Sequence, residues 1–466
     1  MKDLIIEISE ALSQTKWQGI GKTADISGFP TEIPNHWPFS NKLYEILLKP
    51  QVDKAGNHIK DNNGKVILGK LDERGRPIGL HIKGVIASIN TLIKPKLSHN
   101  FLVSSGDQNI NGRADGLLST AHSRSWHDKN AIFIGSQNKF PRALLRIAAL
   151  YHDIGKIIST DLHVTRGLRL MRDIEKKDRD YFENLFESIN ERNRMWALLR
   201  HHDIYGTLCT GEASLAAFSD IVSWTHPEFS FEPIDRSIAA YLTYLLWLNI
   251  ADSDSTLRTV HGGITSVEAD RYLSDWHILI HELLDNNGNP KIIHREEFKK
   301  WSLIVASTVT MTIQRITRLI ATCYRMKTDK IAPYDEILTL VEEELISLYG
   351  HRLEEFCYRF ARFCKLDYAL RFFLELMKDP RMESNEDHVQ LRNMTYRTCM
   401  VLQRITEDYA HLINECDRSS PLLVVNMTGL MNPPETGRAI CKSLKESPSR
   451  ALGWIAEEIG VWLYGE

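Results

Sequence analysis

The chain has 466 residues, more than one small hydrophobic core usually organises, so at least two domains are expected. Hydrophobic residues make up 43% and charged residues 25%, proportions that are typical of a folded globular protein and exclude a largely disordered chain. The formal net charge of −3 excludes a surface that is basic all over, as in many nucleic-acid binders.

Cysteine usage and hydropathy indicate a reduced, cytoplasmic protein. The seven cysteines form no C-x-x-C pair, which argues against a zinc ribbon and against a disulfide scaffold. The N-terminus lacks the basic region and long apolar core of a signal peptide. The most apolar stretch, 238–251, is shorter than the roughly 20 residues of a membrane span, so we interpret it as a buried core helix.

The first part of the chain, residues 1–115, is expected to mix helix, loop and a small β element. Apolar spacing predicts a short helix over 1–14 and a second helix over 81–95. Glycine, proline and tryptophan make 15–40 irregular, and turn signals in 50–80 indicate a β-hairpin or a structured loop. The polar stretch 104–116 then marks a loose domain boundary.

A central domain, residues 116–260, has helical spacing throughout. Its best-defined helix begins after Pro141, carries an apolar face through Tyr151, and ends at Gly155. The remaining helices of this domain are expected at 166–175, 178–191, 193–202, 211–224 and 235–253.

The last part, residues 261–466, is also predicted to be helical. Helices are expected at 266–284, 298–326, 334–348, 351–365, 367–379, 386–415, 434–445 and 449–464. The fold class predicted from the sequence is therefore mainly α: a central helical bundle, a helical C-terminal domain, and a small irregular or β-containing N-terminal region.

The strongest chemical signal is the segment LLRIAALYHDIGK, residues 144–156, in which an apolar helix leads into His152 and Asp153. An adjacent His-Asp pair at a helix end directs an imidazole and a carboxylate to one point, and a carboxylate can bridge two metal ions. The pair is followed by Ile154, Gly155 and Lys156, and this whole context favours it over the two other His-Asp pairs, at 127–128 and 202–203. The segment resembles the signature of the HD superfamily of metal-dependent phosphohydrolases, whose pattern is H…HD…D.

The resemblance implies further metal ligands along the chain. His122, favoured over His127, precedes the motif by a separation similar to that between the first two helices of the family. His163 begins a segment that resembles the family's H-x-x-x-G, and LLRHHDIYG resembles its paired-histidine element. WLNIADSDSTL resembles the closing helix and favours Asp252 over Asp254 and Asp220. The expected ligands are His122, His152, Asp153, His163, His201, His202 and Asp252.

These ligands suit one or two divalent transition ions, either manganese, iron, nickel, cobalt or zinc. Such ions hold a phosphoryl group and activate a water. The resemblance makes Asp153 and Lys156 the expected catalytic residues, with Lys156 neutralising a phosphate oxygen. Arg124 and Arg166 are further candidates for phosphate contacts.

The C-terminal segment 422–466 resembles the end of the bacterial tRNA nucleotidyltransferase and poly(A) polymerase family, on Gly429, Leu430, Pro433, Pro434, Gly437 and Ile440. The HD segment with its downstream H-x-x-x-G also resembles the HD domain fused to those enzymes. The nucleotidyltransferase head is not recognisable before residue 115, so nucleotide addition is not expected. A basic stripe along 313–330 favours an RNA contact through the C-terminal helices. Its residues are Arg315, Arg318, Arg325, Lys327 and Lys330, with Tyr324 among them.

Three functions remain open from the sequence. The first is a phosphodiesterase or phosphatase that acts on a nucleotide or an RNA-end phosphate. The second is an HD-type diiron oxygenase, since the resemblance to members with the same extra histidines allows oxidation of carbon. The third is a non-catalytic HD scaffold or binding module. The sequence does not fix the substrate, the metal or the oligomeric state.

Overall fold

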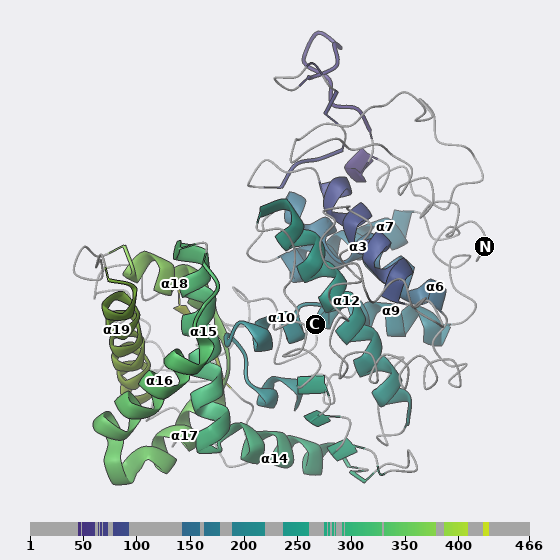
Figure 1. Cartoon of the computed structure of the whole chain (residues 1–466). Helices are drawn as coiled ribbons and strands as arrows, with labels where there is room; N and C mark the ends of the chain where they lie inside the picture. Colours follow the sequence, from purple (N-terminus) through teal and green to yellow (C-terminus); the bar gives the residue numbers. More distant parts are fainter. Residues whose placement is uncertain are drawn as a thin grey trace, which may run out of the picture. The chain divides into compact units, whose positions relative to one another are not determined.

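In the computed structural model, most of the described chain is helical (Figure 1). The mainly α fold class predicted from the sequence is confirmed. The predicted helices at 1–14, 434–445 and 449–464 lie outside the described residues. The structure describes residues 45–47, 49–60, 64, 66–67, 69–72, 78–92, 142–158, 163–177, 189–219, 236–260, 275–276, 278–279, 282–283, 285, 291–292, 294–328, 330–378, 386–408 and 423–427.

These residues fall into two compact units. The first contains the described residues up to Asp203 together with those between 236 and 285, and the second contains 204–219 and the described residues from 291 onward. The division into three domains at 115 and 260 stays a prediction. Helix 78–92, which precedes the first of these boundaries, belongs to the same compact unit as the His-Asp motif.

The first unit is built around the long apolar helix α12. Residues 241–251 of this helix are all buried, as expected for a core helix. Helix α3 packs along α12, α6 packs against α3 and α9, and α7 packs against α9 and the short turn η2. Their bounds are α3 Ile78–Leu92, α6 Arg142–Tyr151, η2 Ile154–Ile157, α7 His163–Lys177, α9 Ile189–His201 and α12 Arg236–Val260.

Two glycines allow a close crossing of backbones between η2 and α7. A Cβ placed on Gly155 would lie 1.9 Å from the carbonyl oxygen of His163 and 2.5 Å from the amide nitrogen of Gly167. Only a residue without a Cβ fits there, so the H-x-x-x-G spacing has a packing cause.

The turn-rich segment at 50–80 forms antiparallel bridges between Val52 and His58 and between Lys60 and Val66. Two backbone hydrogen bonds also stabilise this segment: Ile59 N donates to Gln51 O (2.8 Å), and Ile67 N donates to Ile59 O (2.9 Å). The described residues of this segment therefore form a turn-rich structure with isolated antiparallel bridges, and none of them belongs to an assigned strand.

The second unit packs α15 against α16, α17 and α18, and α19 against α16. Its core is rich in aromatic and aliphatic side chains, including Phe356, Phe360 and Phe373. The elements are α10 Ile204–Cys209, η3 Leu215–Ala217, α14 Arg295–Ala306, α15 Val309–Thr328, α16 Tyr334–Tyr349, η4 Gly350–Arg352, α17 Leu353–Arg362, β1 Phe363–Asp367, α18 Ala369–Leu376, α19 Asp387–Asp408 and β2 Leu423–Asn426.

Three expectations for this unit are wrong in detail. The helix predicted at 298–326 is interrupted at Ser307 and Thr308, where α14 and α15 meet at 71°. The helix predicted at 351–365 ends at Arg362, and β1 pairs in parallel with β2. Residues 211–214 do not form the helix predicted at 211–224, because Gly211 has a φ of +80° and turns the chain.

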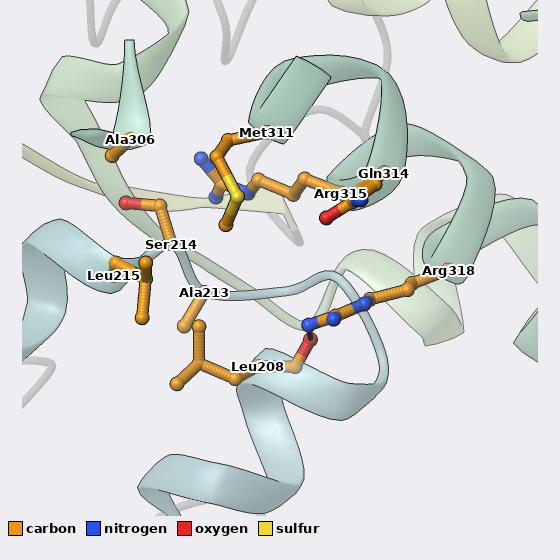
Figure 2. A pocket seen from close by; sticks show the side chains of 9 residues that line it. All are labelled: Leu208, Ala213, Ser214, Leu215, Ala306, Met311, Gln314, Arg315 and Arg318. Carbon is orange, nitrogen blue, oxygen red and sulfur yellow. Dashed lines mark hydrogen bonds between the residues drawn. The ribbon is translucent and has the colours of Figure 1, made fainter. Parts of the chain in front are cut away.

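That turn is held by α15 (Figure 2). Arg315 donates to the carbonyl oxygens of Gly211 (3.1 Å) and Glu212 (3.0 Å), and Arg318 donates to that of Leu208 (3.4 Å). Both arginines are buried, at 6% and 7% exposure. The sequence suggested that both arginines belong to an exposed basic stripe along 313–330. The structure shows that they are buried and do not contribute to such a stripe.

Among the described residues, no single helix has the length and apolar composition needed to cross a membrane. Helices α14 and α15 satisfy that criterion only when taken together as a bent pair.

Candidate metal centre

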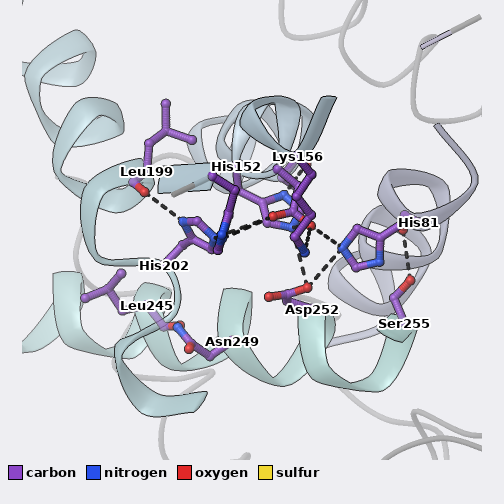
Figure 3. A network of polar contacts seen from close by, with 12 residues as sticks. His81, His152, Lys156, Leu199, His202, Leu245, Asn249, Asp252 and Ser255 are labelled. Atoms are coloured by element: carbon purple, nitrogen blue, oxygen red, sulfur yellow. Dashed lines mark hydrogen bonds and ion pairs between the residues drawn. The ribbon is translucent and has the colours of Figure 1, made fainter. Parts of the chain in front are cut away.

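Five helical elements of the first unit direct histidines and carboxylates to one place (Figure 3). His152 and Asp153 follow the last residue of α6, and His163 is the first residue of α7. His202 follows α9, and α12 supplies Asp252 from its middle. Helix α3 adds His81, which no sequence motif indicates.

Two of the imidazoles are oriented by the ends of their own helices. Nδ1 of His152 lies 2.8 Å from the carbonyl oxygen of Ala149, and Nδ1 of His202 lies 2.7 Å from that of Leu199. The last carbonyls of a helix have no partner within the helix and are free to accept these bonds. A bond at Nδ1 leaves Nε2 as the nitrogen that faces the centre, as is usual for metal-binding histidines.

The first donor set consists of His81, His152, Asp153 and Asp252. Nε2 of His81 lies 2.8 Å from Oδ2 of Asp153 and 3.0 Å from Oδ1 of Asp252. Nε2 of His152 lies 3.5 Å and 3.6 Å from the same two oxygens. The four donor atoms lie within 4.8 Å of one another, which is compact enough to surround one ion.

The second donor set consists of Asp153, His163 and His202. Here the other carboxylate oxygen of Asp153, Oδ1, lies 3.5 Å from Nε2 of His163 and 3.7 Å from Nε2 of His202. The two nitrogens are 3.1 Å apart. Asp153 therefore offers one oxygen to each set, which is the arrangement of a carboxylate that bridges two ions.

The chemistry of these atoms fits divalent transition ions. Nε2 of His152 and Oδ1 of Asp153 are buried and are not satisfied by a hydrogen bond of normal length. Buried polar atoms without a partner are costly, and a cation at this point would satisfy them. Imidazole nitrogens combined with carboxylate oxygens are the ligands of manganese, iron, cobalt, nickel and zinc.

The electrostatics keep the carboxylates ionised. Burial opposes the charged form, but the ammonium of Lys156 and the neighbouring imidazoles outweigh it and hold the pKa of Asp153 well below its usual range. Burial likewise opposes ionisation of Asp252, and Lys156 holds the pKa of that carboxyl well below its usual range. Nζ of Lys156 forms an ion pair with Oδ2 of Asp153.

The histidines respond differently to the same surroundings. Burial lowers the pKa of His163 to about 4, so this imidazole is neutral near pH 7 and has a lone pair for an ion. Burial also opposes protonation of His81 and His202, but hydrogen bonding to Asp153 outweighs it and raises the pKa of both.

Close packing of α3 on α12 positions His81. A Cβ on Gly84 would lie 2.2 Å from Oγ of Ser255, so the two helices approach closely at this glycine. The Ser255 hydroxyl donates to the carbonyl oxygen of His81 at 2.9 Å. The same contact that brings the helices together therefore fixes the backbone of the histidine.

Most of the residues selected from the sequence meet at this centre: His152, Asp153, Lys156, His163, His202 and Asp252. His201 is buried but enters neither donor set; its Nδ1 lies 2.8 Å from the hydroxyl of Tyr241 and 3.1 Å from the carbonyl oxygen of Ala197. Arg166 is partly buried on α7 and makes none of the ion pairs of the centre. His122, Arg124 and the alternative His127 lie outside the described residues.

His81 was missed because it belongs to no recognisable motif. It lies on the helix predicted at 81–95, where a single histidine gives no signal of its function. Only the packing of α3 on α12 shows that it faces Asp252.

Comparison with known proteins agrees with the geometry. The HD domain family matches residues 121–223. HD domains are metal-dependent hydrolase domains, and the match includes His152, Asp153, His163 and His202. His81 and Asp252 lie outside the matched segment, so the first donor set combines residues of the HD segment with two residues from elsewhere in the chain. No curated protein and no solved structure matches the chain.

Proposed function

We propose that the chain is a metal-dependent phosphohydrolase, either a phosphodiesterase or a phosphatase, that acts on a nucleotide or on the phosphate at an RNA end. The observation that carries the proposal is the position of Asp153, whose two oxygens face two different sets of donors. A pair of divalent ions held in this way supplies a clamp for a phosphoryl group and an activated water.

The protein residues have separable tasks in this proposal. His81, His152 and Asp252 would hold one ion, His163 and His202 would hold the other, and Asp153 would contribute to both sites. Lys156, in an ion pair with Asp153 and only 16% exposed, is close enough to contact a phosphate bound at the ions. Its ammonium then neutralises a non-bridging oxygen, which stabilises the charge that develops during transfer. Arg166 and Arg124 remain candidates for outer phosphate contacts.

The resemblance to the RNA-processing nucleotidyltransferases supports an RNA end as one substrate class. An RNA contact through the C-terminal helices stays a prediction, and it would not rest on Arg315 or Arg318, which are buried. Lys330 forms an ion pair with Asp387 at 2.7 Å. A diiron oxygenase uses the same types of ligand and is the alternative activity at this centre.

The test uses the full chain loaded with manganese, iron, cobalt, nickel or zinc. The substrates to be tested are phosphomonoesters, phosphodiesters and RNA ends with a cyclic phosphate. Release of phosphate or alcohol is measured for each substrate, and oxygen uptake is measured in parallel. We expect hydrolysis without oxygen consumption, and its loss in Asp153→Asn. The control is Asp335→Asn, because Asp335 is an exposed carboxylate at the start of α16. Oxygen uptake without phosphoester hydrolysis would favour the oxygenase instead.

A further inference from the structure

Helix α7 carries a row of cations that begins one turn after a metal ligand (Figure 1). The first residue of the helix, His163, belongs to the second donor set, and the row follows at intervals of three or four residues: Arg166, Arg169, Arg172 and Lys176. Residues at such intervals are neighbours on the surface of a helix. With a rise of about 1.5 Å per residue, this α7 row extends about 15 Å along the axis, away from the end that holds His163.

The α7 row lies on the exposed side of the helix. Arg166 is half-buried beside the metal centre, and the other three cations are exposed. The opposite side packs into the first unit, where Met171 is fully buried. The sequence of α7 contains five cations but only two acids, Asp173 and Glu175. The exposed side therefore has an excess of positive charge.

These cations are also unpaired. None of the four side chains of the α7 row forms an ion pair or a hydrogen bond with the described part of the chain. Exposed lysines of the second unit differ in this respect, since Lys330 pairs with Asp387 at 2.7 Å and Lys378 with Glu375 at 2.6 Å. The positive charge of the α7 row is thus available to a ligand.

The helix macrodipole does not account for the row. It favours cations only in the last turn of a helix, which explains Lys176 but not the others. Arg166 and Arg169 lie in the first half of α7, where a cation gains nothing from the dipole. Their position next to His163 is better explained by a ligand that continues outward from the metal centre.

We propose that the α7 row binds the phosphate backbone of a single-stranded RNA whose terminal phosphate lies at the metal centre. A row of cations matches the repeated charges of a backbone, as in other proteins that bind single strands. A mononucleotide supplies one phosphate group and cannot pair with successive cations. Contacts to phosphates carry no sequence information, so binding is independent of base sequence. The inference rests on the proposed function for the position of the RNA end, and it assigns a strand as substrate in preference to a free nucleotide.

The test is fluorescence anisotropy of a labelled oligouridylate of about ten nucleotides, titrated with the full chain at several salt concentrations. The chain carries Asp153→Ala and is kept in chelator, so that the RNA stays intact and binding is measured apart from the metal centre. We expect saturable binding that salt weakens, with a slope of about −0.7 in log–log form for each phosphate contact. Uridine monophosphate should not compete at similar concentrations.

The decisive variant combines Arg169→Gln and Arg172→Gln, which remove two exposed, unpaired charges and keep residues that favour helix. It should reduce the salt slope by about 1.4 and weaken binding about tenfold near 0.15 M salt, with an unchanged melting temperature. The control combines Arg352→Gln and Arg392→Gln, which remove two exposed charges from the second unit and should leave the slope unchanged.

Three results would overturn the proposal: no saturable binding, an unchanged salt slope in the α7 variant, or an equal loss of affinity in the control. The fate of the proposed function is decided separately, by the hydrolysis assay on the unsubstituted chain. RNA binding through the α7 row in a chain that hydrolyses no phosphoester would refute the proposed function and leave the binding surface standing. Hydrolysis of small phosphoesters without RNA binding would refute the binding surface alone.

Discussion

Substitution of Gly155 by alanine tests whether the crossing of η2 and α7 sets the geometry of the second donor set. The added Cβ would lie 1.9 Å from the carbonyl oxygen of His163 and 2.5 Å from the amide nitrogen of Gly167. A Cβ atom essentially never lies closer than 3.0 Å to a non-bonded heavy atom, so the two segments must separate by about 1 Å. Because the obstructing atoms belong to the backbone, no side-chain rotation relieves the clash.

That separation moves the residue that begins α7. Nε2 of His163 now lies 3.5 Å from Oδ1 of Asp153, and metal ligands tolerate errors of only about 0.2 Å. We expect Gly155→Ala to lose the ion of the second set, with a fall in metal affinity of about 10- to 100-fold. The strain of overpacking should also cost about 1–3 kcal/mol of the free energy of unfolding.

The assay is elemental analysis of metal content after dialysis, together with urea denaturation. Gly167→Ala is the matched control at the same crossing, because a Cβ there would meet its nearest neighbour, the amide nitrogen of Gly155, at 3.4 Å, close to ordinary contact. It should retain metal. Equal metal content in Gly155→Ala and the unsubstituted protein would refute the reasoning.

Three further predictions follow from other contacts. Gly84→Ala should force the hydroxyl of Ser255, whose Oγ would lie 2.2 Å from the new Cβ, out of its hydrogen bond to the carbonyl oxygen of His81, and should lower metal occupancy of the first donor set only; unchanged stoichiometry would contradict this. Lys156→Gln should retain its metal but reduce turnover by about 10²-fold, the effect of removing one stabilising charge; an unaltered kcat would exclude contact with the phosphate. Burial raises the pKa of Glu212 to about 7 from 4.5, so the folded state binds this proton more tightly than the unfolded state. Stability should therefore fall as the pH rises from about 4.5 to 7, by up to about 3 kcal/mol, and Glu212→Gln should remove that fall in denaturation curves recorded across this range. An identical pH dependence in the variant would show that this carboxyl ionises normally in the folded protein.

Local sequence signals predicted much of the centre because several ligands lie at the ends of helices. The apolar face leading into His152, and Gly155 after it, indicate where α6 ends and where its side chains point. The closing segment with Asp252 lies on a long apolar helix that the structure describes as α12. In these cases the residues next to the ligand determine its position.

The features that were not predicted depend on contacts between segments far apart in the chain. His81 reaches the centre only because α3 packs on α12, and the pairing of β1 with β2 joins residues about 60 positions apart. The break between α14 and α15 has a local cause. The hydroxyls of Ser307 and Thr308 donate to the carbonyl oxygens of Ile304 and Val305 at 2.8 Å and 2.9 Å, and thus compete with helical hydrogen bonds.

The basic stripe along 313–330 shows a further limit of sequence reasoning. Helical spacing correctly places Arg315 and Arg318 on one helix, α15. It cannot show that both arginines are buried, because their hydrogen bonds go to the carbonyl oxygens of Leu208, Gly211 and Glu212, which lie far away in the sequence. Charge on a helix predicts a binding surface only where the charge remains exposed.

The most direct test of the central claim is the metal stoichiometry of a set of single variants of the full chain. If Asp153 serves both donor sets, the unsubstituted protein binds about two equivalents of a divalent transition ion. His202→Ala and Asp252→Ala should each lose one equivalent, from different sets, and Asp153→Ala should lose both. Full metal occupancy in Asp153→Ala would contradict the account. A second contradicting result would be that His202→Ala and Asp252→Ala each lose both ions while Asp153→Ala still retains one.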